Sequence, residues 1–189
     1  MKLSYLLALI SLVVLASCGE KTKNSTELTL INGGRTYGGE LVFSYSEPIT
    51  ELFPLAAAHQ HVINVSSQIY ETLLNIDPKT LKVTPSIASS FTVNEAGDVY
   101  TLKIQKGIFF HDDECFGGKG RELTPEDVKY SLDFACSGNE LNDDNNVLVD
   151  QIKGASEYKA SSKKSFPKGG VSGIKIKGQS IEITLNRPF

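Results

Sequence analysis

The chain has 189 residues, of which 40% are hydrophobic and 22% are charged, and this is enough to build the core of one domain. Its formal net charge is −3, from 19 Lys and Arg and 22 Asp and Glu side chains. Because binding to nucleic acid needs a basic surface, this charge argues against a nucleic-acid partner. The sequence also lacks a nucleophile pattern such as GxSxG, so we predict that the protein is not an enzyme.

The N-terminus has the pattern of a bacterial lipoprotein signal. Lys2 precedes an apolar run over residues 3–14, which is too short for a membrane-spanning helix of about 20 residues. The sequence LASC at 15–18 then places small residues before a cysteine, as in a lipobox. We predict that residues 1–17 are removed as a signal peptide and that Cys18 carries lipid, including palmitate. Two or three acyl chains would hold the protein to a bacterial membrane outside the cytoplasm, in the periplasm or at the cell surface. The alternative is an ordinary signal peptide with an incidental cysteine.

The segment after the lipobox, residues 18–39, is polar and rich in Lys, Thr, Asn and Gly, which is typical of a flexible tether. Its glycine pairs lack the GxxxxGK[ST] pattern of a phosphate-binding loop. Alternation of Leu41, Phe43 and Tyr45 with smaller or polar residues then predicts a strand over residues 40–46.

A helix is predicted over residues 55–74, because apolar residues recur there at spacings of three and four. These residues are Val62, Val65, Ile69 and Leu73. The sequence NIDP at 75–78 is expected to close this helix, and a short strand and a loop should follow. A hairpin comes next, with its turn at residues 94–98 and one face of the strand over 100–104 buried.

Thr124 and Pro125 mark the start of a second helix, with Glu126 and Asp127 at its positive end. A third helix is predicted around the apolar residues between 147 and 158. The chain then forms a hairpin, in which Ile174 and Ile176 face Ile181 and Ile183.

Six pieces of this chain, in order, resemble the family 5 extracellular solute-binding proteins, which are the peptide-type receptors of ABC importers. They are IYETLL at 69–74, DPKT at 77–80, PSIASSF at 85–91, YTLKI at 100–104, KGIFFHD at 106–112 and LTPEDVKYSL at 123–132. The resemblance runs from about residue 39 to the end. It implies a two-lobed α/β fold of the type II periplasmic-binding-protein kind, locally α+β, which closes on its ligand by hinge motion. Only part of lobe I is expected in this chain.

The resemblance also implies how the chain is divided. Residues 40–61 would begin lobe I, residues 62–168 would form an inserted α+β subdomain, and residues 169–189 would be truncated return strands into lobe I. The positions that match the ligand-contacting loop of the family are Ser46, Glu47 and Pro48. Extended main chain there would pair with a peptide backbone, although Glu47 also fits a solvated turn.

The function implied by the resemblance is that of a substrate-binding lipoprotein. It would capture peptides outside the cytoplasm and deliver them to an ABC permease and its ATPase subunits, without a cofactor. Oligopeptide, dipeptide, nickel chelate and sugar remain open as ligands. The alternatives are a truncated surface lipoprotein that takes no part in transport, and a metal-binding lipoprotein.

Residues 113–121, DECFGGKGR, depart from the family pattern, because a short turn is usual there. Cys115 in this segment and Cys136 remain after lipidation of Cys18, and in an oxidising compartment we predict a disulfide between them; two buried free thiols are the alternative.

Histidines 59, 61 and 111, with the acidic residues and the cysteine that follow His111, have the side chains of a zinc site. We predict no metal site, because residues 59 and 61 would lie on different faces of a helix and residue 111 belongs to a turn. The acidic loop at 142–146 resembles a calcium loop in composition only, since it lacks the central glycine and the closing glutamate.

Overall fold

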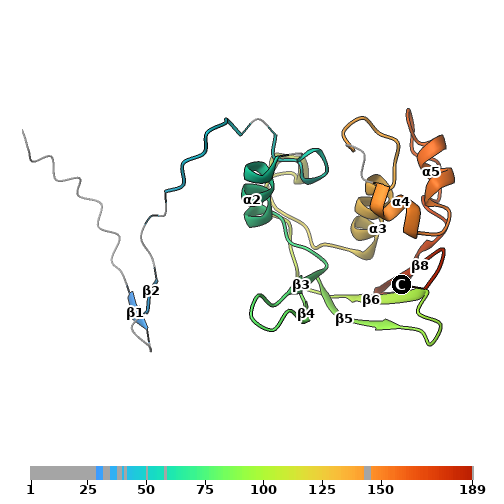
Figure 1. The fold of residues 1–189 in the computed structure, drawn as a ribbon, viewed down its shortest axis with the longest axis horizontal. Coiled ribbons are helices and arrows are strands. Elements are labelled where there is room, and N and C mark those ends of the chain that lie inside the picture. The colour runs from blue at the N-terminus through green and yellow to red at the C-terminus, as the bar shows by residue number, and fades with distance from the viewer. Residues whose placement is uncertain are drawn as a thin grey trace, which may run out of the picture. The chain divides into compact units, whose positions relative to one another are not determined.

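The structure is a computed structural model, and it describes residues 29–31, 35–37, 40, 42–49, 51–57, 59–142 and 146–188 (Figure 1). It contains two compact units, Met1–Ser46 and Glu47–Phe189. In the first unit, β1 (Thr29–Ile31) pairs antiparallel with β2 (Arg35–Tyr37), so a short hairpin lies within the segment predicted to be a tether. The predicted signal peptide and Cys18 lie outside the described residues.

The strand predicted over residues 40–46 is wrong for the residues that the structure describes. Glu40 and residues 42–46 are irregular and exposed, and none of the described strands pairs with them. An alternating pattern becomes a strand only when a neighbouring strand takes up its backbone hydrogen bonds. Without one, the rings of Phe43 and Tyr45 stack on each other, with their centroids 6.5 Å apart.

The second unit is built on a four-stranded antiparallel sheet in the order β5-β6-β8-β7. Its strands are β5 (Ala88–Val93), β6 (Val99–Ile104), β7 (Ile174–Lys177) and β8 (Ser180–Thr184). Both predicted hairpins are confirmed, including the pairs Ile174 with Ile183 and Ile176 with Ile181. The first hairpin turns at Asn94, whose side-chain oxygen accepts hydrogen bonds from the backbone N–H groups of Asp98 and Val99 at 3.0 Å.

A helical layer lies against this sheet (Figure 1). It contains α3 (Pro125–Ala135), α4 (Asn146–Gln151) and α5 (Ala155–Ser161). The predicted start of α3 is confirmed, since Oδ2 of Asp127 accepts hydrogen bonds from N and Oγ1 of Thr124 at 2.8 and 3.0 Å. The single helix predicted between 147 and 158 is two helices, because Gly154 lies in the left-handed region with φ of 75° and interrupts it.

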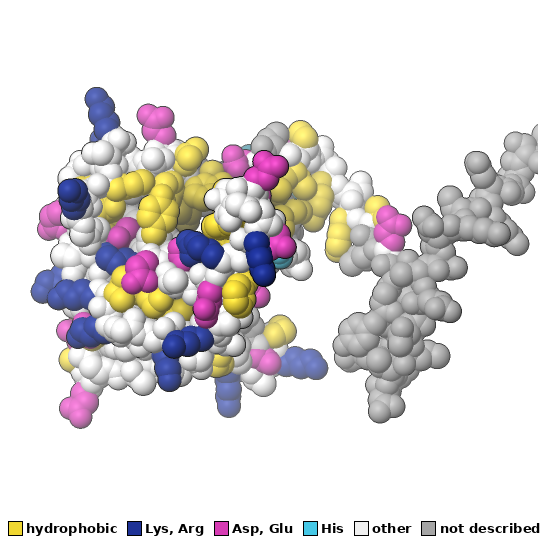
Figure 2. Space-filling view, turned by 180° about the vertical axis from the view of Figure 1, so that it is seen from behind, with side chains coloured by type: hydrophobic (Ala, Val, Ile, Leu, Met, Phe, Trp, Pro, Cys, Tyr) yellow, Lys and Arg dark blue, Asp and Glu magenta, His cyan; other side chains and the backbone are white. Residues whose placement is uncertain are grey.

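One hydrophobic core joins the sheet to this helical layer. Its buried members include Leu102, Ile104, Val128, Ile152, Tyr158, Val171, Ile174 and Ile181. On the face drawn in Figure 2, further hydrophobic side chains gather over the helical side of the unit, with Lys and Arg side chains mostly around them. Across the described residues, no helix is both long enough and apolar enough to span a bilayer.

The helix predicted over residues 55–74 is shorter than expected. A 3₁₀ turn, η1 (Pro54–Ala56), precedes α2 (Gln60–Ile69), and Leu74 already belongs to β3 (Leu74–Ile76), which pairs with β4 (Val83–Pro85). The carbonyl oxygen of Leu73 accepts a hydrogen bond from the backbone N–H of Ala88 at 2.8 Å. Pairing with the β5 end of the sheet therefore overrides the helical periodicity at this end.

The β3–β4 turn contains a non-glycine residue in the left-handed region, Leu81, with φ of 56°. Because this conformation crowds a side chain, we expect Leu81→Gly to raise the free energy of unfolding by about 0.5–1 kcal/mol. Urea denaturation followed by circular dichroism measures the change. Lys82→Gly is the matched control. Lys82 does not have a positive φ, so this variant should be less stable than the wild type. A Leu81→Gly variant less stable than the wild type would contradict the prediction.

Candidate functional site

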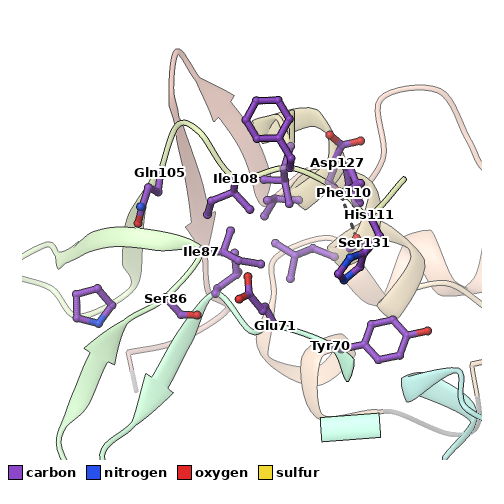
Figure 3. A pocket seen from close by; sticks show the side chains of 16 residues that line it. Tyr70, Glu71, Ser86, Ile87, Gln105, Ile108, Phe110, His111, Asp127 and Ser131 are labelled. Carbon is purple, nitrogen blue, oxygen red and sulfur yellow. Dashed lines mark hydrogen bonds between the residues drawn. The ribbon is translucent and has the colours of Figure 1, made fainter. Parts of the chain in front are cut away.

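A cavity of about 990 Å³ opens in the second unit (Figure 3). Four parts of the chain line it: the segment after α2, the passage from β4 to β5, the loop after β6, and one side of α3 together with Leu123, two residues before this helix. The lining residues are Tyr70, Glu71, Leu73, Pro85, Ser86, Ile87, Gln105, Ile108, Phe109, Phe110, His111, Leu123, Asp127, Val128, Ser131 and Leu132. Its size falls within the usual range for small-molecule sites.

The walls of the cavity are mainly apolar, and backbone hydrogen bonds fix the loop after β6 that forms one of them. The backbone N–H of Leu123 donates to the carbonyl oxygen of Ile108 at 2.8 Å, and that of Phe110 donates to Arg121 at 3.0 Å. These antiparallel hydrogen bonds hold the loop against the segment before α3. Such a wall can bury an apolar group of a ligand without being rebuilt.

Polar side chains lie among these apolar walls. In Figure 3, Glu71 and Ile87 reach toward the middle of the cavity and Gln105 lies at its margin. The carboxylate of Glu71 forms no salt bridge with any residue that the structure describes. Ser131 donates its hydroxyl proton to the carbonyl oxygen of Asp127 at 3.0 Å. The cavity therefore combines apolar area with one unpaired negative charge, which suits a ligand that has an apolar part and a cationic group.

Residues 113–121 support the cavity from outside. They include η2 (Glu114–Phe116) and end at Arg121, whose guanidinium donates to both carboxylate oxygens of Asp127 at 2.6 and 2.7 Å. The same guanidinium lies 5.0 Å from the ring centroid of Phe110 and 5.5 Å from that of Phe116. These two rings stack with their centroids 5.4 Å apart. Arg121 thus ties the expanded turn to the cavity wall by charge and by cation–π contact.

The pKa of the Asp127 carboxyl is lowered to about 2, chiefly by the hydrogen bonds from Arg121; burial opposes this shift, and the hydrogen bonds from Thr124 add to it. A lowered pKa stabilises the fold above the unfolded value of 3.8, and this contribution is lost as the pH falls toward 2. We expect Asp127→Asn to cost about 1 kcal/mol at pH 6, because the half-exposed Arg121 is screened by water. Urea denaturation from pH 6 to 2 should show this difference shrinking below pH 4. A difference that stays constant over this range would contradict the assignment.

The three residues predicted to contact ligand, Ser46, Glu47 and Pro48, are exposed and irregular, and none of them lines the cavity. Ser46 belongs to the first unit, whereas Glu47 and Pro48 belong to the second. Their role in binding stays a prediction.

The cysteines do not form the predicted disulfide in this structure. Both thiols are free: Cys115 is exposed on η2, and Cys136 is fully buried at the end of α3. Burial raises the pKa of the Cys136 thiol to about 11, with Asp133 adding to the effect. Cys136 is therefore a packed core residue, and its thiol is protonated at neutral pH.

The histidines are arranged differently from the sequence expectation. His59 comes just before α2 and has an extended backbone, so the two histidines are not both helical as expected. The rings of His59 and His61 stack, with their centroids 5.7 Å apart. His111 lines the cavity. Among the described residues, no three His, Cys, Asp or Glu side chains gather in a way that would hold a metal ion.

Residues 143–145 of the acidic loop lie outside the described part, and the amide of Asn142 donates to the carbonyl oxygens of Ala135 and Ser137 at the end of α3.

The sequence reasoning missed the cavity and its support by Phe116 and Arg121. The presence of an aromatic and a basic residue in the long turn over residues 113–121 was the one sequence feature that could have pointed to this support. The sequence alone does not show that these residues contact Phe110 and Asp127, because folding brings them together.

Comparison with known proteins gives consistent results. The family model for bacterial extracellular solute-binding proteins, family 5 Middle, matches residues 82–189. The oligopeptide-binding protein AppA of Bacillus subtilis is 33% identical over 139 residues, which cover 72% of this chain and 23% of AppA. Heme-binding protein A of Haemophilus influenzae is 25% identical over 176 residues, covering 93% of this chain and 30% of that protein.

Solved structures also match the fold. Peptide-bound OppA of Listeria monocytogenes superposes with a TM-score of 0.59 and 25% identity, over 77% of this chain and 26% of that one. OppAIV, a periplasmic oligopeptide-binding protein of Borrelia burgdorferi, gives a TM-score of 0.57 and 22% identity, over 73% of this chain and 26% of that one. The predicted mixed α/β fold class is confirmed. The chain spans about a quarter of the length of the relatives that it matches.

Proposed function

Because the chain belongs to the bacterial extracellular solute-binding proteins of family 5, we propose that it captures peptides outside the cytoplasm as part of a substrate receptor of an ABC importer. The receptor would pass its ligand to a membrane permease driven by ATPase subunits. The observation that carries the proposal for this chain is the cavity of about 990 Å³ with apolar walls and with Glu71, which forms no salt bridge within the described residues.

Two kinds of contact are proposed for the peptide. The backbone of Ser46 and Glu47 lies outside every described strand, so its polar groups can pair with a peptide main chain, and Pro48 ends the pairing because it lacks an N–H group. Separately, the cavity would take an apolar side chain, and Glu71 would attract the amino terminus or a basic side chain of the ligand.

The protein is also proposed to be a lipoprotein, held to the membrane through Cys18. The order of the basic residue, the apolar run and the small residues before the cysteine supports this. Metabolic labelling with palmitate that Cys18→Ala abolishes is the expected result, and labelling that persists in the variant would contradict it.

Calorimetric titration of the full chain with trileucine tests the binding proposal. Glu71→Gln should weaken the affinity for trileucine about tenfold, since it removes the negative charge that faces the amino terminus. The same substitution should leave the affinity for N-acetyl-trileucine unchanged. Glu95→Gln, which changes an exposed carboxylate in the β5–β6 turn, is the matched control and should bind as the wild type does. Equal losses for both ligands, or no binding of either, would contradict the proposal.

Haem is a second candidate ligand, for one specific reason. Tyr70 and His111 both line the cavity, and both side-chain types ligate haem iron. The similarity to Heme-binding protein A over 93% of this chain adds to this reading. Titration with hemin should then shift and sharpen the Soret band of hemin, and His111→Ala and Tyr70→Phe should weaken this change. A spectrum of free hemin in the presence of the wild type would eliminate this candidate.

A further inference from the structure

The hairpin of β3 and β4 presents apolar side chains to solvent at its end. We call residues 76–83 the hairpin tip. Ile76 is 67% exposed, Leu81 is 77% exposed and Val83 is 49% exposed. Ile76 and Val83 are direct cross-strand partners, so their side chains lie on the same face of the hairpin. Figure 1 shows the loop between β3 and β4 extending away from the helices of the unit.

The hairpin tip is held in a defined conformation by Asp77. Oδ1 of Asp77 accepts hydrogen bonds from the backbone N–H groups of Lys79 and Thr80 at 2.9 and 2.7 Å, and its carbonyl oxygen accepts one from Leu81 at 2.8 Å. These bonds keep Leu81 in its left-handed conformation. Glycine would suit this backbone better, so the leucine is not explained by the folding of the turn, and strain of this kind points to a function.

Two lysines surround the exposed leucine. Lys79 and Lys82 are exposed, and neither forms a salt bridge with any part of the chain that the structure describes. The nearby carboxylate of Asp77 is occupied by backbone N–H groups. The hairpin tip therefore combines apolar side chains with free positive charge, on a chain whose net charge is −3.

We propose that the hairpin tip inserts into the interface of a lipid bilayer that contains anionic headgroups. Leu81, Ile76 and Val83 would enter the boundary of the acyl chains, and Lys79 and Lys82 would stay among the headgroup phosphates. A stable protein–protein interface buries far more area than three side chains at the end of one hairpin provide. A lipid surface needs no matching shape, so a small projecting tip is sufficient. The insertion would orient the unit on the membrane, and it is independent of the cavity and its ligand.

The chain contains no tryptophan, so one introduced indole reports its own surroundings without background. Leu81→Trp in the full chain is mixed with vesicles of phosphatidylcholine alone, or with one third phosphatidylglycerol, with and without brominated acyl chains. The anionic vesicles should shift Trp emission to shorter wavelength, and brominated lipid should quench it at least twofold. Adding Lys79→Glu and Lys82→Glu should remove both effects.

Two further variants keep the test decisive. Val83→Trp places the indole on a regular strand, so it reports the same insertion if Leu81→Trp fails to fold. Val147→Trp places it at another exposed position, on α4, and its emission should not respond to brominated lipid. Equal quenching at 83 and 147, or none at 81 and 83, would overturn the proposal. A shift that grows with protein concentration in the absence of lipid would also overturn it, because a second copy of the chain would then cover the hairpin tip.

Discussion

Replacing Ile181 with alanine should lower the free energy of unfolding by about 2–5 kcal/mol. Ile181 is 0% exposed on β8, the strand between β6 and β7, where it pairs with Leu102 on one side and Ile176 on the other. Truncation would leave a cavity at the centre of the sheet and against the helical layer, and a paired strand on each side limits how far the backbone can close it. Urea denaturation followed by circular dichroism measures the loss.

Ile76→Ala is the matched control for this prediction. It removes the same atoms from a side chain that is mostly exposed, so the free energy of unfolding should change by less than about 0.5 kcal/mol. Similar losses for the two variants would show that Ile181 does not belong to the principal core.

Replacing Asp133 with alanine should cost about 3 kcal/mol, since the change leaves two partners without an acceptor. Asp133 is buried near the end of α3, and its carboxylate accepts hydrogen bonds from Lys129 Nζ at 2.9 and 3.1 Å and from the backbone N–H of Val171 at 2.9 Å. It thereby joins α3 to the segment that leads into β7. Gly170 fits beside it because a Cβ at that position would overlap the carboxylate.

The control for Asp133 is another ion pair in the same unit. Lys177 Nζ lies 2.7 Å from Oε2 of Glu182, but the lysine is largely exposed, so Lys177→Ala should cost less than about 0.5 kcal/mol. Thermal unfolding of the two variants side by side distinguishes them. If Asp133→Ala unfolded at the same temperature as Lys177→Ala, the carboxylate would not be holding Val171.

The elements that follow local rules could be predicted from the sequence. The helix start at Thr124 and Pro125 and the alternating isoleucines of β7 and β8 carry their own signals, and the structure confirms both. The predicted strand over residues 40–46 and the end of the predicted helix near Leu74 are wrong for the same reason. In each case, the pairing of strands decided the backbone, and pairing depends on contacts that a local pattern does not contain.

The cavity could not be predicted because its lining comes from segments that are distant in the sequence. Glu71 and Asp127, for example, line one cavity only after the loop that follows β6 is laid against the segment before α3. The predicted disulfide is absent for a related reason: an even number of cysteines does not show which of them the fold buries or brings together. Cys136 is enclosed in the core while Cys115 is exposed on an expanded turn.

The ligand carried by the native protein tests the central claim most directly. The protein would be isolated from its source cells under native conditions and denatured with acid, and the small molecules released would be identified by mass spectrometry. We predict short peptides that include apolar residues, at a substantial fraction of one mole per mole of protein, and a lower amount of bound peptide when a Glu71→Gln variant is isolated in the same way. Release of haem alone, of another solute, or of no ligand at all would contradict peptide capture.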